Sequence, residues 1–183
     1  MQFGCGASIR YQDCVEAVQA AEEPQAADAA YGARLAAANI NPATGLASDY
    51  LNHFNEAIML LEMLSSCPDC RADFLGWRPM SYREHFAASR FTARDLAIAA
   101  YDAADPSLRG CLDTLAGTMT AVLEATRAAM SADMAPEHAA TLADHAAAWL
   151  RPLVARAGAV INGDADANVP DTPQAVVDGL MKR

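Results

Sequence analysis

The chain has little positive charge. Of its 183 residues, 13 are Lys or Arg against 23 Asp or Glu, and the only lysine is Lys182, so the formal net charge is −10. Attraction to nucleic-acid phosphates or to an anionic membrane surface requires clustered positive charge. We therefore expect neither nucleic acid nor a membrane among the partners of this protein.

Long apolar runs and a secretory leader are also missing. The most apolar stretch is interrupted by Glu62, and the opening residues MQFGCGASIR have neither a basic start nor an apolar core. The five cysteines are an odd number without a repeated spacing, which disfavours a secreted disulfide scaffold. These absences predict a soluble, cytoplasmic protein.

Signals for β-strands are scarce, because β-branched residues are few and no hairpin dipeptide separates alternating strands. Alanine, leucine and methionine dominate, and 53% of the residues are hydrophobic against 20% charged. The length suits one domain. We predict a single all-α domain over residues 1–183: a helical bundle with about four long helices plus short connecting helices. Residues 1–10 should form an N-terminal arm, and residues 162–183 a loop with a short helix.

Local capping signals place several helix ends. Ser81 and Glu84 have the spacing of a capping box, and Asp105 followed by Pro106 is typical of an N-cap and a first-turn proline. Pro152 is expected to kink or interrupt the last long helix. The expected helices cover about 11–22, 26–39, 82–89, 92–104, 106–130 and 136–161, and a central helix begins at about 43 or 47 and ends at about 65.

Residues 48–64, SDYLNHFNEAIMLLEML, begin polar and become almost wholly apolar. The polar residues Asp49, Asn52, His53 and Glu56 fall within one sector of about 100°, because successive helical residues are offset by about 100°. The opposite side of this helix is apolar, so neighbouring helices should cover both broad faces. The polar sector should then be at least partly buried, where its groups need partners.

The last long helix carries His138 and His145 seven residues apart, hence on one face, which they share with Leu142 and Trp149. This pattern predicts that both histidines lie on the core stripe. Imidazole and carboxylate groups on facing helices are the usual ligands of transition metals in bundles. His53, Glu56, His138 and His145 could thus bind Zn, Fe or Mn. Asp49, Asn52 or His85 could add a ligand or orient one.

Two further motifs indicate possible functions. Cys67 and Cys70 form a single Cys-x-x-Cys, which is typical of thiol redox sites when a thiolate is stabilised. In residues 75–86, LGWRPMSYREHF, aromatic and basic side chains gather in a chain that is otherwise acidic. This combination is typical of interface anchors and ligand pockets, and it marks Trp77, Arg78, Tyr82 and Arg83.

Three functional hypotheses follow from the sequence. The first is a metal-binding bundle protein with the buried His/carboxylate site, which could be a metal-dependent enzyme. The second is a non-enzymatic interaction or small-ligand-binding protein without a cofactor, in which the polar cluster is a structural network of the core. The third is a thiol redox protein that uses Cys67 and Cys70. A small-molecule ligand suits the first two, and a homodimer could form.

Overall fold

The computed structural model describes residues 26–67, 69–130 and 134–164. Most of these residues are helical, and the described ranges contain no β-strand beyond one isolated bridge between Ile40 and Ala47. The prediction of an all-α protein is confirmed for this part of the chain. The expected N-terminal arm, the helix at 11–22 and the segment from 165 onward lie outside the described residues.

The described helices occur in the expected order, with α4 as an additional helix that the sequence did not predict. They are α2 (Ala26–Ala37), the short 3₁₀ helix η1 (Ser48–Leu51), α3 (Asn52–Met63), α4 (Cys70–Gly76), α5 (Tyr82–Ala88), α6 (Arg94–Ala103), α7 (Pro106–Ala129) and α8 (Pro136–Asn162). Only α7 and α8, with 24 and 27 residues, exceed 12 residues among them. A bundle with about four long helices is therefore not confirmed.

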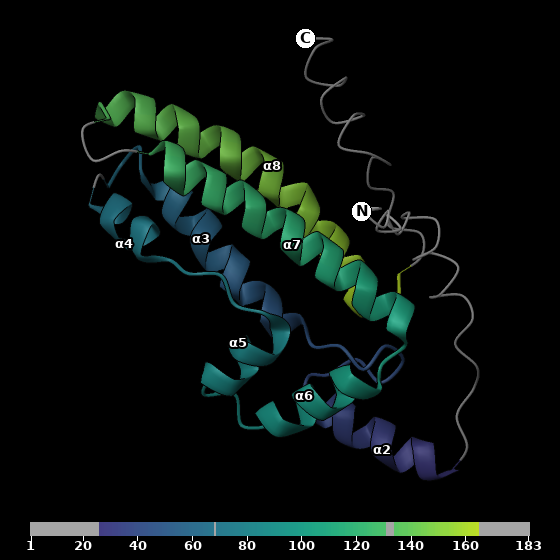
Figure 1. Cartoon of the computed structure of the whole chain (residues 1–183). Coiled ribbons are helices and arrows are strands. Elements are labelled where there is room, and N and C mark those ends of the chain that lie inside the picture. Colours follow the sequence, from purple (N-terminus) through teal and green to yellow (C-terminus); the bar gives the residue numbers. More distant parts are fainter. Residues whose placement is uncertain (1–25, 68, 131–133, 165–183) are drawn as a thin grey trace, which may run out of the picture.

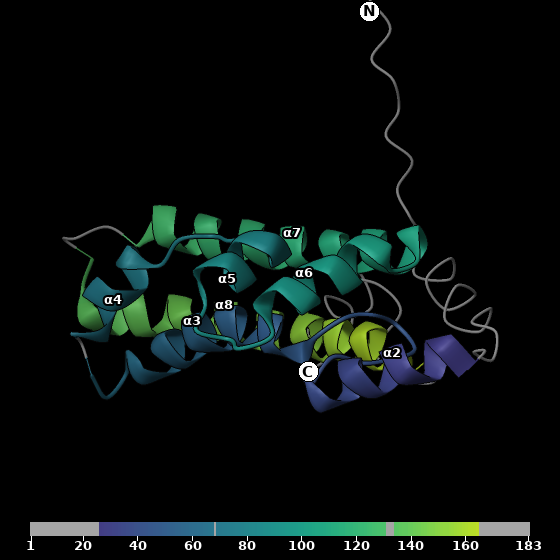
Figure 2. The same ribbon diagram turned by 90° about the horizontal axis from the view of Figure 1, so that it is seen from below.

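The arrangement consists of a long helical layer with a smaller helical part against one side. Figures 1 and 2 show α7 and α8 side by side along their length, with α3 packed next to α8. The short helices α5 and α6 pack against each other and lie beside this layer, near η1. The helices α5 and α6 therefore lie beside one side of α7.

The caps predicted for α5 and α7 are present, whereas α6 begins after Ala93 without a side-chain cap. The Ser81 side chain accepts from the Glu84 backbone N–H, and the Glu84 carboxylate accepts from the Ser81 N–H, which completes the capping box of α5. At α7, the Asp105 carboxylate accepts from the N–H groups of Ser107 and Leu108. α8 continues through Pro152 to Asn162. Local sequence thus fixes where α5 and α7 begin.

One hydrophobic core runs between α3, α7 and α8 and continues under the short helices α4, α5 and α6. Large side chains come from α3 and α7, including Phe54, Leu61 and Met119, none of which is exposed. The buried face of α8 is made mainly of alanines, which let neighbouring helices approach closely. Burial of each large apolar side chain contributes about 1.5–3 kcal/mol to the stability of the fold.

Candidate functional site

The residues expected to bind a metal are divided between the core and the surface. His53 on α3 is buried with 4% exposure, whereas Glu56 and Asn52 on the same helix are exposed. His138 and His145 on α8 are both exposed. In the ranges that the structure covers, no three His, Cys, Asp or Glu side chains are grouped so that they could hold a metal ion. The metal site stays a prediction, without support from these positions.

The exposure of the α8 histidines has a simple geometric reason. The buried face of α8 is centred on Ala143 and Leu150. At about 100° per residue, His138 and His145 lie about 120–140° around the helix from Leu150. Trp149, on the same flank, is 50% exposed. From the sequence, the large side chains on that flank, such as Trp149, were expected to face the core. In the structure, the alanines on the other side of α8 form most of the buried face.

His53 and His85 do come together, within an aromatic cluster of the core. The His53 ring stacks on Trp77 with centroids 4.7 Å apart, and it lies 6.1 Å from the ring of His85. Burial, and then the nearby His85, lower the pKa of His53 to about 4. Burial also lowers the pKa of His85, although the negative charge of the half-buried Asp49 acts in the opposite direction and raises it. His53 is therefore neutral at pH 7 and packs as an aromatic side chain.

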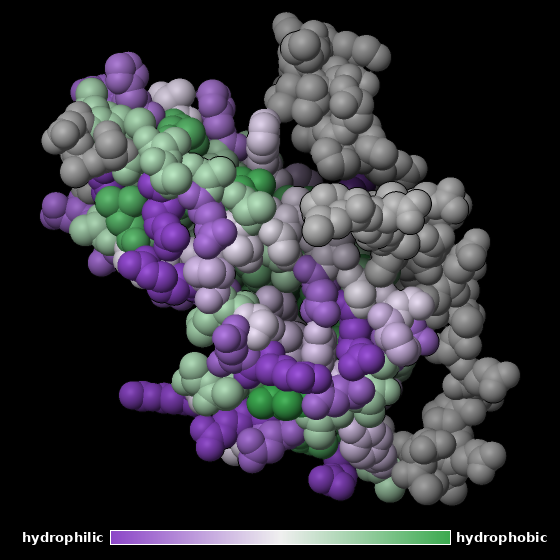
Figure 3. All heavy atoms as spheres, in the orientation of Figure 1, coloured by the Kyte–Doolittle hydropathy of each residue, from purple (hydrophilic) through white to green (hydrophobic). Residues whose placement is uncertain are grey.

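A groove of about 770 Å³ lies between α5, α6 and α7. In Figure 3 the surface is hollowed on this side, between the α5–α6 part and the long helices. The charged and aromatic side chains on its walls are Tyr50 from η1, Tyr82, Arg83 and Glu84 from α5, Tyr101 from α6, and Arg109 and Asp113 from α7. Gly110 and Gly117 lie on the same wall of α7 as Asp113. The groove thus combines both signs of charge with apolar surface.

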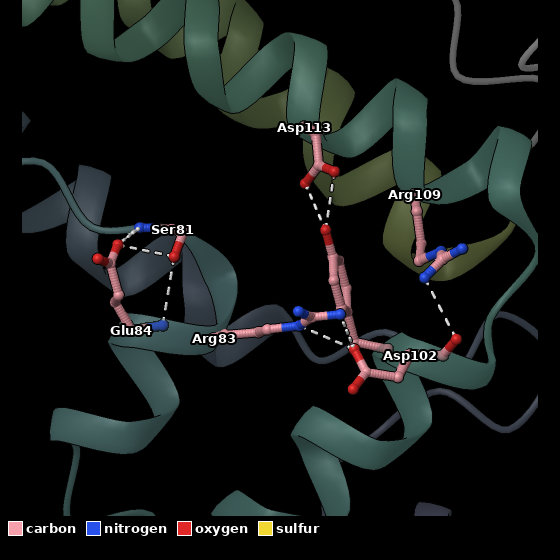
Figure 4. Close-up of polar contacts among 7 residues, drawn as sticks. Ser81, Arg83, Glu84, Asp102, Arg109 and Asp113 are labelled. Carbon is pink, nitrogen blue, oxygen red and sulfur yellow. Dashed lines mark hydrogen bonds and ion pairs between the residues drawn. The ribbon is translucent and has the colours of Figure 1, made fainter.

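Hydrogen bonds between helices hold the polar side chains of the groove in place, as Figure 4 shows. The Tyr101 hydroxyl donates to the Asp113 carboxylate, with oxygen–oxygen distances of 2.7 and 2.8 Å. Arg83 donates from Nε and Nη2 to Oδ1 of Asp102, at 2.9 and 2.5 Å. Arg109 donates from Nη1 to the Asp102 backbone carbonyl at 3.2 Å. These bonds connect each of the three helices to another.

Three tyrosines support the groove from the core side. The rings of Tyr82 and Tyr101 stack with centroids 4.4 Å apart, and Tyr50 lies 5.2 Å from Tyr82. Their hydroxyls are engaged: Tyr82 accepts from the Ala47 N–H, and Tyr50 donates to the Met80 carbonyl. Burial, followed by the hydrogen bond with Asp113, raises the pKa of Tyr101 to about 12. Tyr101 is therefore a protonated donor at neutral pH.

The four residues expected in a pocket or interface, from the segment 75–86, do not all lie in one place. Tyr82 and Arg83 line the groove. Trp77 instead packs in the core, and its Nε1 donates to the His53 carbonyl at 3.2 Å. Arg78 is exposed and donates to the carbonyls of Leu75 and Trp77. Two of the four residues therefore belong to this groove.

Sequence reasoning missed the half of the groove that α6 and α7 provide. Tyr101, Arg109 and Asp113 carried no recognised motif. One signal was available: Gly110, Asp113 and Gly117 lie at i, i+3 and i+7, hence on one face of α7. Two glycines within a long helix are unfavourable unless that face needs space.

The two cysteines of the Cys-x-x-Cys motif are close to each other. Cys67 is half-buried in the turn that follows α3, and Cys70 is the buried first residue of α4. Both are free thiols. A hydrogen bond with the Cys67 side chain, then burial and the nearby Asp73 and Asp69, raise the pKa of Cys70. This surrounding disfavours a Cys70 thiolate.

No protein-family model matches the sequence, and neither a curated protein nor a solved structure shows a significant similarity to it. Among the helices of the described ranges, none is both long enough and apolar enough to cross a membrane.

Proposed function

We propose that this chain is a non-enzymatic, small-ligand-binding helical protein, and that the groove between α5, α6 and α7 is its binding site. This is the second of the hypotheses drawn from the sequence. The observation that supports it most directly is the groove itself, with its volume of about 770 Å³. Pockets for small molecules in proteins typically have about 300–1,000 Å³ and join apolar walls to a few fixed polar groups.

The hydrogen bonds on the walls support the same proposal. Asp113 and Tyr101 hold each other across α6 and α7, and Arg83 is held by Asp102 across α5 and α6. The Tyr101–Asp113 contact is partly buried, so a ligand would lose little free energy in ordering this pair. The Arg83–Asp102 ion pair is exposed and contributes less to this ordering.

The glycine at position 117 is further evidence that the groove has room for a ligand. A Cβ at Gly117 would meet no atom within 4 Å, so packing within the described chain does not require a glycine there. Glycine in a helix interior costs about 1 kcal/mol relative to alanine. Space above the α7 wall offers a reason for this cost, since a side chain at position 117 would project into the groove.

Gly117→Leu tests the proposal by filling the groove. The variant should fold at least as well as the parent, because leucine is a better helix former than glycine. Gly76→Leu is the matched control: position 76 lies at the end of α4, a Cβ there also has open space, and it does not line the groove. The measurement is a thermal-shift screen of the three proteins against a library of water-soluble fragments.

The proposal predicts fragments that raise the melting temperature of the parent and of Gly76→Leu but not of Gly117→Leu. It is contradicted if every stabilising fragment acts equally on Gly117→Leu, because such fragments bind elsewhere. In this proposal the His53–Trp77–His85 cluster is structural, and the protein is a single cytoplasmic domain that needs no metal and could form a homodimer.

Thiol redox chemistry at Cys67 and Cys70 is a second candidate, favoured by the contact between the two thiols. It predicts that treatment with oxidised glutathione converts both thiols to an intramolecular disulfide while reducing one molecule of the oxidant to two thiols. Mass spectrometry that finds Cys67 and Cys70 still alkylatable after this treatment would exclude the candidate.

A further inference from the structure

The groove contains two carboxylates that lack a cationic partner. In the described part of the chain, no Lys, Arg or His side chain lies within 4.0 Å of the carboxylate of Asp113 or Glu84. The hydrogen-bond donors to Asp113 and Glu84 are Tyr101 and Ser81, respectively, and both donors are neutral. The hydrogen bonds from Ser81 lower the pKa of Glu84, which keeps this carboxyl group ionised.

The two arginines of the groove are engaged with a different residue, Asp102 at the end of α6. Arg83 forms an ion pair with the Asp102 carboxylate, and Arg109 donates to its backbone carbonyl, where a cation also interacts favourably with the helix dipole. Figure 4 shows both guanidinium groups directed toward Asp102 and away from Asp113. The Asp113 carboxylate accepts its hydrogen bonds from the Tyr101 hydroxyl. Asp113 is therefore exposed on the groove wall without a cationic partner among the described residues.

The wall next to Asp113 is apolar and open. Ala116 and Gly117 follow it on α7, and Met80 contributes to the opposite side of the groove. This wall suits a short hydrocarbon or aromatic body next to the charge. The net charge of −10 on the chain adds a field that concentrates cations near the protein.

We propose that the ligand of the groove carries a primary ammonium group that binds at Asp113, with an apolar body against Ala116 and Gly117. This inference rests on the proposed function of the groove. The ammonium group can belong to a simple amine or to a zwitterion. In a zwitterion, the carboxylate would be directed toward the end of the groove where Arg83 and Arg109 lie.

Four probes of similar size separate these ligand types: 2-phenylethylamine, phenylalanine, 2-phenylethanol and 3-phenylpropionate. Their affinities are measured by isothermal titration calorimetry on the parent, on Asp113→Asn and on Asp144→Asn. Asn at position 113 keeps one oxygen that can accept from Tyr101, removes the charge and replaces the second oxygen by an NH2 group. Asp144→Asn makes the same charge change at an exposed position of α8 outside the groove.

We expect 2-phenylethylamine, phenylalanine or both to bind the parent at least ten-fold more tightly than the neutral alcohol. Asp113→Asn should weaken this binding about ten-fold or more, as for the loss of a hydrogen bond to a charged group, and Asp144→Asn should leave it unchanged. Tighter binding of phenylalanine than of the amine would identify the zwitterion, and the reverse order the simple amine.

The failure of this inference can be distinguished from the failure of the proposed function. If only 2-phenylethanol or 3-phenylpropionate binds, and Gly117→Leu abolishes that binding, the groove is a ligand site but the ammonium assignment is wrong. If amine binding is equal in the parent and in Asp113→Asn, the assignment is also wrong. If no probe binds the parent, the ammonium assignment is wrong, and the fragment screen with Gly117→Leu decides separately whether the groove is a ligand site.

Discussion

The buried imidazole of His53 makes a quantitative prediction about stability below neutral pH. Its pKa in the folded protein is about 4, against 6.5 for the ordinary side chain. Because the unfolded chain binds the proton more tightly than the folded chain, protonation favours unfolding. The stabilisation is fully present above pH 6.5 and is lost as the pH falls toward 4. With about 1.4 kcal/mol per pKa unit, the loss by pH 4 is about 3 kcal/mol.

His53→Phe isolates this contribution. A phenyl ring can keep the stacking on Trp77, and Nε2 of His53 is buried without a hydrogen-bond partner in the described structure, so no hydrogen bond of that nitrogen is lost. At pH 7 the variant should differ from the parent by less than about 1.5 kcal/mol. Between pH 6.5 and 4, the variant should lose about 3 kcal/mol less of its free energy of unfolding than the parent.

The assay is urea denaturation followed by circular dichroism at several pH values between 7 and 4. His145→Phe is the control, since His145 is exposed, and it should keep the pH dependence of the parent. Parallel loss of stability in the parent and in His53→Phe would refute the reasoning, because His53 would then not be a buried neutral group.

Three further predictions concern other parts of the chain. Gly117→Ala should raise the free energy of unfolding by about 1 kcal/mol, measured by urea denaturation, since a Cβ fits there and alanine favours the helix; destabilisation would mean that the backbone at 117 is strained. Iodoacetamide at neutral pH should modify the half-buried Cys67 before the buried Cys70, whose pKa is raised, as read by peptide mass spectrometry; the reverse order would contradict this burial. Removing metal with EDTA should leave the melting temperature unchanged, because His138 and His145 are exposed; a decrease that His138→Ala abolishes would restore the metal hypothesis.

The ends of several helices could be predicted because they depend on local chemistry. A helix at about 82–89 was expected from the spacing of Ser81 and Glu84, and α5 covers Tyr82–Ala88. A helix at about 106–130 was expected after Asp105 and Pro106, and α7 covers Pro106–Ala129. The capping groups lie within three residues of the backbone groups that they bind, so their sequence carries the information.

The buried side of α8 could not be predicted in the same way. Its surroundings are set by α3 and α7, and the chain buries Ala143 and Ala146 while Trp149 stays half-exposed. A sequence pattern weighted toward large apolar residues favours the wrong flank when small residues make the closest helix contacts. The prediction that His138 and His145 face the core depended on that choice of flank.

The groove depends on contacts between separate helices, and for that reason the sequence indicated only part of it. Tyr82 and Arg83 stood out because they belong to one aromatic and basic segment. Their counterparts come from farther along the chain: Asp102 is 19 residues beyond Arg83, and Asp113 is 12 residues beyond Tyr101. Only the packing of α5, α6 and α7 brings these residues to one place.

The most direct test of the central claim is an NMR titration of the ¹⁵N-labelled protein with 2-phenylethylamine. If the groove is a binding site for ammonium ligands, the chemical-shift changes will be largest at the backbone amides of Tyr82, Tyr101, Asp113 and Gly117 and will saturate together. Shifts that do not saturate, or that centre on the exposed Trp149 of α8 and leave these four amides unchanged, would contradict it.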